Sequence, residues 1–214
     1  MFLEFLTSLR ARLLTTSSLA QETVRDGQTL TNGFFQSTVV DNTPAFLLDN
    51  DFARFLNFGD VVTNGAPAAV QVDGEDAQLF NFRTGSIEAN NGADVLATGV
   101  QVNGSADIRN FGEIAGAFNG VQFAGANSSG TLDNFRGGVV SSDSRAVDIQ
   151  GEGVTVRNFG ESVGTGAQRN GTIYTNATAE DVTINNFSGA TIDAGVAGAG
   201  ISFQVGDEAG DAVS

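Results

Sequence analysis

The chain contains no cysteine, histidine, lysine or tryptophan, and each absence removes a class of chemistry. Without cysteine there is no disulfide, no thiol nucleophile and no thiolate metal ligand. Histidine is the commonest general base and a usual zinc ligand, and lysine is a common Schiff-base nucleophile. Few catalytic residue types therefore remain, so the chain is expected not to be an enzyme, and calcium is the one cofactor that stays possible.

Positive charge is scarce as well. Of 214 residues, 25 are Asp or Glu and only 10 are basic, all of them arginine, which gives a net charge of -15. Nucleic acids and anionic membrane surfaces are bound by clustered basic residues, so this balance argues against both as partners. It favours solubility and leaves cation binding as a candidate property.

Long apolar runs are absent apart from the opening stretch. Residues 1–14 are apolar but carry Glu4, Arg10 and Arg12, are too short to span a bilayer, and lack the features of a secretory signal. Apolar residues recur there at helical spacing, so residues 1–27 are expected to form an N-terminal cap, a short amphipathic helix and a polar link. A helix that binds a partner or a membrane surface is the alternative.

One short pattern recurs through the rest of the chain. Its clearest copy is Ala106–Gly112, which reads Ala-Asp-Ile-Arg-Asn-Phe-Gly. The Asn-Phe pair recurs at 57, 81, 110, 134, 158 and 186, and a degenerate copy, Asn32-Gly33-Phe34, precedes them, so that successive copies are 24 to 29 residues apart. A fixed period in this range is typical of solenoid proteins.

Each repeat contains three short strand-like segments. In the first segment of the six complete repeats, the residues two and four positions before the asparagine are apolar or glycine and the residue between them is polar, which is the pattern of a strand with one buried face. Two further segments follow, as at Ile114 and Gly120–Phe123. Residues 28–214 are therefore predicted to form an all-β parallel β-helix of about seven coils, each of roughly 24 residues, with equivalent strands about 4.8 Å apart.

The chain from Ile201 to Ser214 ends within a coil, so the β-helix is expected to be truncated and to continue in a longer protein. Coils of this length favour a right-handed path by analogy with other β-helices. The open strand edges of a terminal coil invite end-to-end addition, so self-association is an expected property.

The run Ile108–Ile114, with the pattern apolar-x-Asn-x-Gly-x-Ile, resembles the repeats of bacterial surface β-helices such as autotransporter and haemagglutinin-type passengers. The resemblance covers residues 28–206. It implies an extracellular or cell-surface location and a non-catalytic role in a surface layer, filament or adhesin. The chain departs from that pattern by placing Phe after the asparagine, and Arg or Ser where glycine is usual, at Arg83, Arg136 and Ser188.

Three columns of side chains are predicted from the repeat. The asparagines are expected to form a buried amide ladder, the last included: Asn32, Asn57, Asn81, Asn110, Asn134, Asn158 and Asn186. The phenylalanines that follow them are expected to stack inside the corner, an exposed apolar stripe being the alternative. On the third strand Gln71, Gln101 and Gln122 point outward, either as a glutamine ladder or as a polar face for surface glycans.

Two acidic clusters are candidate calcium ligands, Asp73, Glu75 and Asp76 in one and Asp207, Glu208 and Asp211 in the other. Neither matches an EF-hand loop or a calcium β-roll, and solvated acidic loops are the simpler interpretation.

The alternative function is a carbohydrate-active enzyme. Pectate-lyase-like enzymes share the expected architecture, and this likeness would assign Arg109, Arg157 and Asp133 to a polyuronate lyase or epimerase-like site. The simpler interpretation is that these three residues form a charge ladder along the outer face.

Overall fold

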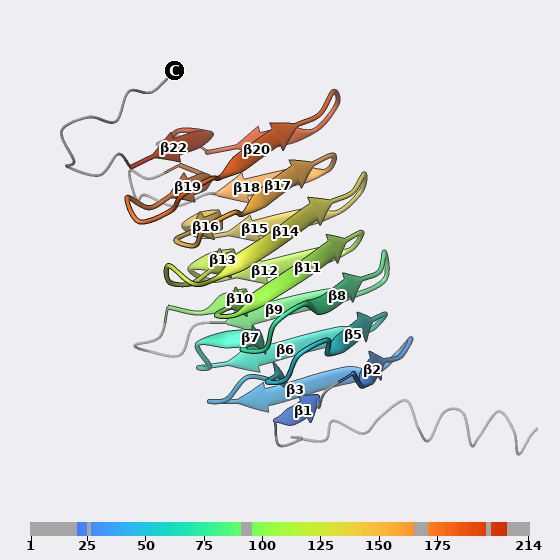
Figure 1. Ribbon diagram of the computed structural model, residues 1–214. Helices are drawn as coiled ribbons and strands as arrows, with labels where there is room; N and C mark the ends of the chain where they lie inside the picture. The colour runs from blue at the N-terminus through green and yellow to red at the C-terminus, as the bar shows by residue number, and fades with distance from the viewer. Residues whose placement is uncertain (1–20, 25–26, 91–95, 165–170, 196–197, 205–214) are drawn as a thin grey trace, which may run out of the picture.

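The computed structural model describes residues 21–24, 27–90, 96–164, 171–195 and 198–204, and these contain 22 strands and no helix. The strands form three parallel sheets, and neighbouring strands of each sheet lie in successive tiers in Figure 1. Along the chain the strands visit sheet 1, sheet 2 and sheet 3 in turn. One visit to all three sheets is called a coil, so that coil 1 is β2, β3 and β4, and coil 7 is β20, β21 and β22.

Sheet 1 contains the first strand of every coil: β2 (Thr29–Asn32), β5 (Arg54–Asn57), β8 (Ala77–Asn81), β11 (Ser105–Asn110), β14 (Ser129–Asn134), β17 (Thr155–Asn158) and β20 (Thr183–Asn186). Sheet 2 contains the second: β3 (Ser37–Asp41), β6 (Asp60–Asn64), β9 (Ser86–Asn90), β12 (Glu113–Gly116), β15 (Val139–Ser142), β18 (Glu161–Gly164) and β21 (Thr191–Asp193). Sheet 3 contains β1 (Glu22–Val24) and the third: β4 (Phe46–Leu48), β7 (Ala68–Val72), β10 (Thr98–Val102), β13 (Asn119–Phe123), β16 (Arg145–Ile149), β19 (Ile173–Thr175) and β22 (Ile201–Phe203).

The predicted β-solenoid is confirmed by these pairings. Every strand pairs in parallel with its equivalent one coil away, and the repeat keeps its register, with Ile108 opposite Leu132 and Asn110 opposite Asn134. The seven strands of sheet 1 are separated by six turns of the chain. Side chains alternate between the interior and the surface along each strand, so one set of positions per sheet fills the core.

The core is a stack of apolar side chains from all three sheets. In coil 4, Ile108 of sheet 1, Ile114 of sheet 2 and Val121 of sheet 3 are all fully buried. Phe55 and Phe123 are the largest fully buried side chains. A single coil could not bury these faces, because each one is covered by the coils above and below it.

The stacking begins early in the chain. β1 pairs with β4, with Glu22 opposite Phe46, so it lies within the stretch that the sequence assigns to the polar link. A three-residue strand that contains Glu and Thr carries too little apolar periodicity to be recognised from sequence. The expected N-terminal helix falls in residues 1–20, outside the described residues. No described segment is a helix able to cross a membrane.

Candidate functional site

A ladder of asparagine side chains runs along the inside of sheet 1. Each Nδ2 from Asn32 to Asn158 donates to the Oδ1 of the asparagine one coil later, at 2.7 to 2.9 Å. The same nitrogen also donates to the backbone carbonyl of the first residue of the second strand in that next coil. Asn110, for example, donates to the Val139 carbonyl at 3.0 Å. Both amide hydrogens are therefore bonded in the same axial direction.

The last asparagine differs from the others. Asn186 accepts from Asn158 at 2.8 Å, but its side chain is exposed, so the expectation that it is buried is wrong. The reason is that burial of each asparagine requires a coil on both sides, and among the described residues no coil follows Asn186.

The phenylalanine column lies on the outside of the turn between sheet 1 and sheet 2, here called the aromatic corner. Phe58, Phe82, Phe111, Phe135 and Phe159 are half-buried, and Phe187 is 40% exposed, so the expectation that the rings lie inside is wrong. Because each asparagine points inward, the next residue points outward. The rings stack nearly parallel, within 12° of each other from Phe58 to Phe187.

Turns at the aromatic corner alternate between two lengths. Coils 1, 3, 5 and 7 have four residues between the first two strands, and coils 2, 4 and 6 have two. The four-residue turns close with a backbone hydrogen bond, as from the Gly85 N–H to the Phe82 carbonyl at 2.7 Å. The ring spacing alternates in step: from Phe58 to Phe187 the successive centroid distances are 4.0, 6.4, 4.3, 6.0 and 4.0 Å.

Glycine in each short turn explains this alternation. A Cβ on Gly112 would lie 2.2 Å from the Gly85 carbonyl oxygen and 2.4 Å from that of Phe82, because the short turn nests in the long turn before it. Gly59 and Gly160 meet the preceding long turns in the same way. In the long turns the residue after Phe is free of this contact, so Arg83, Arg136 and Ser188 mark the odd-numbered coils and leave the strand register unchanged.

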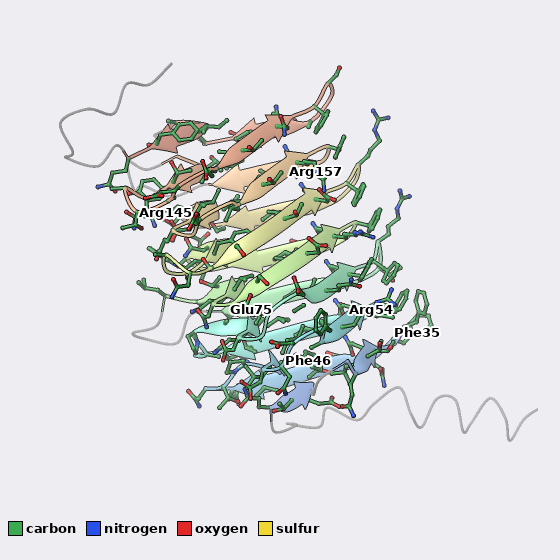
Figure 2. The ribbon with its side chains drawn as sticks, viewed as in Figure 1. Phe35, Phe46, Arg54, Glu75, Arg145 and Arg157 are labelled. Carbon is green, nitrogen blue, oxygen red and sulfur yellow. The ribbon has the colours of Figure 1, made fainter. Side chains whose placement is uncertain are left out.

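Arginines on the outer face of sheet 1 have two kinds of partner. Arg157 binds Asp133 through two hydrogen bonds, from Nε at 2.5 Å and from Nη2 at 3.0 Å. Arg109 instead lies over the ring of Phe80 at 5.1 Å, and Arg54 lies over the same ring at 4.7 Å. The expected charge ladder through Arg109, Asp133 and Arg157 is therefore wrong at Arg109, because the aromatic ring one coil below competes for its guanidinium. Arg54 and Arg157 are labelled in Figure 2.

A double-mutant cycle measures this pair. Between Asp133→Asn and Arg157→Gln we expect a coupling energy of about 0.2–1 kcal/mol in the free energy of unfolding, because the Arg157 side chain is 44% exposed and solvent screens the pair. Urea unfolding of the four variants provides the values. The matched cycle of Asp133→Asn with Arg109→Gln is expected to give no coupling energy. Equal coupling energies in the two cycles would show that all three residues form one charge ladder.

On the outer face of sheet 3 the glutamines do not bond to one another, so the expected glutamine ladder is wrong. Gln71 donates to Asp73 at 2.9 Å, Gln101 to Asn103 at 3.0 Å and Gln122 to Asp148 at 2.8 Å. A carboxylate or a turn amide lies within reach of each glutamine and is the stronger or nearer acceptor.

Sequence reasoning missed a buried ionic cluster on this face. Asp148 is fully buried, and its carboxylate accepts hydrogen bonds from Gln122 and Gln150 and contacts Arg145 at 3.2 Å. The Arg145 guanidinium also lies 4.3 Å from the ring centroid of Tyr174. The one available signal was the spacing of Arg145 and Asp148 across a single strand, which alone does not predict burial. Its members pair mainly with one another, although Asp148 Oδ1 and Arg145 Nε are buried without a hydrogen bond in the described part of the chain.

The first acidic cluster is not assembled around a common point. Asp73 accepts from Gln71 and Asn103, while Glu75 and Asp76 donate their backbone N–H groups to Asp51 and Ser105. In the parts of the chain that are described, no three acidic side chains are grouped as metal ligands. Asp207, Glu208 and Asp211 lie outside the described residues. Calcium binding stays a prediction.

A shallow groove of about 290 Å³ lies over sheet 2 where coil 4 carries small residues. Ala115, Gly116 and Ala117 form its floor, and Glu88 and Asp143 stand on either side, one coil below and one coil above. It holds two carboxylates and no cation of its own. Comparison with protein families, curated proteins and solved structures finds no match for this chain.

Proposed function

We propose that this chain is a non-catalytic structural and adhesive segment of an extracellular bacterial surface protein, which associates through its coil ends. The resemblance of the repeat to surface β-helix passengers supports the location. The enzyme alternative would need Asp133 and Arg157 to be available to a substrate, whereas the two side chains bind each other.

The observation that carries the proposal is the face of coil 7 that no described residue covers. Ile201 and Phe203 of β22 are 38% and 60% exposed, whereas the equivalent residues of β19, Ile173 and Thr175, are 0% and 3% exposed beneath them. Asn186 likewise presents amide hydrogens on the side where every earlier asparagine donates to the next coil. This face has the shape and hydrogen-bonding groups that a further coil would cover, and a second copy can supply one.

Sedimentation velocity of the purified chain tests the proposal. We expect the wild type to form end-to-end assemblies that grow beyond a dimer with concentration and Phe203→Asp to form none of these, because a charge in the apolar face opposes its burial. Leu96→Asp is the matched control, since Leu96 is 64% exposed but lies at the side of the stack, before β10.

The same experiment is run with calcium and with a chelator, and the samples are imaged by negative stain. The comparison distinguishes calcium-dependent from calcium-independent assembly. Ordered assembly only with calcium would direct mutagenesis to Asp73, Glu75 and Asp76. A wild-type monomer under both conditions would contradict association through the ends, and glycan binding to the outer face of sheet 3 would be tested next.

A further inference from the structure

The aromatic corner is an apolar ridge on the side of the molecule, and nothing described covers it. The rings stack in pairs at 4.0 to 4.3 Å, with wider steps of 6.0 and 6.4 Å between the pairs, and every ring is partly accessible to solvent, at Phe58, Phe82, Phe111, Phe135, Phe159 and Phe187. At the coil 1 end, Phe34 is 59% exposed and Phe35 is 84% exposed. Phe35 lies in the turn between β2 and β3 and points away from the stack (Figure 2). A continuous apolar stripe of this kind is typical of an association surface.

Charged residues flank this ridge in strict alternation. In coils 2, 4 and 6 the residue after the turn is acidic and exposed: Asp60, Glu113 and Glu161. In coils 1, 3, 5 and 7 the same position is Ser37, Ser86, Val139 or Thr191. The long turns of coils 3 and 5 carry the exposed arginines Arg83 and Arg136, which make no ion pair with any described residue. From coil 2 to coil 6 the sign of the charged residue at the corner therefore changes at every coil along the backbone.

The two arginine side chains extend along the stack and carry their charges from coils 3 and 5 to coils 5 and 7, which are also odd-numbered. Arg83 Nη2 lies 4.0 Å from the place a Cβ on Gly137 would take, and Arg136 Nη2 lies 3.8 Å from the same place at Gly189. Each side chain thus passes the intervening short turn and ends beside the next long turn. The guanidinium groups stay at odd-numbered coils and the carboxylates at even-numbered ones.

An edge with alternating charge is complementary to itself. When two copies lie antiparallel, related by a two-fold axis, an odd-numbered coil of one faces an even-numbered coil of the other at every second alignment. Each guanidinium group then lies at the level of a carboxylate of the other copy, because the coils of both copies have the same spacing of about 4.8 Å. Such charge pairing fixes the alignment and orientation of the two copies, and the phenylalanine rings supply the apolar contact area between them.

We infer that two copies of this chain associate side by side and antiparallel through the aromatic corner, with Arg83 and Arg136 of each copy facing acidic residues of the other. This inference goes beyond the proposed function, because it uses the side of the stack and leaves the coil ends free. A partner of uniform charge would meet both signs along this edge, so a second copy fits it better than a polyanion.

Charge inversion tests the inference. The measurement is sedimentation equilibrium of the full chain at physiological ionic strength, in the Phe203→Asp background so that association through the coil ends does not contribute. We expect a dimer whose Kd rises at least about tenfold in R83E/R136E, because every charge at the corner is then negative. D60R/E113R/E161R is expected to weaken it similarly.

The variant that carries all five substitutions is decisive. It inverts the pattern without removing the alternation, so we expect its Kd to return to within about threefold of the starting value. Glu152→Arg, on the turn between sheet 3 and sheet 1, is the control for a change in net charge and is expected to leave the dimer unchanged. Thermal unfolding checks that each variant folds.

Three results would overturn the inference: a monomer in the Phe203→Asp background at all concentrations, a five-substitution variant as weak as R83E/R136E, or binding of dextran sulfate by a protein that stays monomeric. The substitutions leave coil 7 intact. End-to-end assembly of chains that keep the native Phe203 therefore tests the proposed function separately.

Discussion

Asn110→Leu is expected to lower the free energy of unfolding by several kcal/mol. Leucine removes the acceptor of Asn81 Nδ2 and the donor to both Asn134 Oδ1 and the Val139 carbonyl. Each buried polar group left without a partner costs about 1–3 kcal/mol, and water cannot reach this site because Asn81, Asn110 and Asn134 are all buried. Urea unfolding followed by far-UV circular dichroism measures the loss.

Asn186→Leu is the matched control for this substitution. Asn186 is exposed and its loss removes only the acceptor of Asn158, so we expect a cost of less than half that of Asn110→Leu. Equal effects at the two positions would show that the ladder does not stabilise the coils through its buried hydrogen bonds.

Gly112→Ala is the second substitution with a large expected effect. The added methyl would meet the Gly85 and Phe82 carbonyl oxygens at 2.2 and 2.4 Å, and both are backbone atoms that move only with their turn. Overpacking of this kind costs about 1–3 kcal/mol or more. We expect the melting temperature to fall and the Phe82–Phe111 stack to open further.

Gly33→Ala controls for the substitution itself. Its Cβ would meet only the flexible Gln36 side chain, at 3.0 Å from Oε1, in a long turn of the same corner. We expect its effect to lie within about 0.5 kcal/mol of zero. If Gly112→Ala were equally mild, the nesting of short turns in long turns would not be a source of stability.

The β-solenoid could be predicted because its evidence is repeated seven times. An asparagine two residues after an apolar residue defines the first strand in every coil, and stacking similar coils brings the asparagines into one column. Local alternation and global period agree, so no knowledge of distant contacts was needed.

The outer surfaces could not be predicted in the same way, because several partners compete there. Arg109 had a carboxylate one coil above and an aromatic ring one coil below, and only the structure shows that it lies over Phe80. Gln122 likewise pairs with Asp148 rather than with another glutamine. The burial of Asp148 depends on side chains from neighbouring coils, which no single repeat reveals.

The departures from the repeat were visible in the sequence, but their meaning was not. Arginine or serine follows the phenylalanine at Arg83, Arg136 and Ser188, where the other complete copies have glycine. The register is constant, and what changes is the length of the turn into which the next coil fits.

The alternation of long and short turns makes a pair of coils, not a single coil, the unit that can be duplicated or lost. Excising one coil would place two turns of equal length next to each other. Two short turns would lack the long turn into which the glycine fits, and two long turns would leave a gap between them. Excising two neighbouring coils would preserve the sequence of fits. An evolving gene for such a protein would therefore lengthen or shorten in steps of about fifty residues, the span of one coil pair.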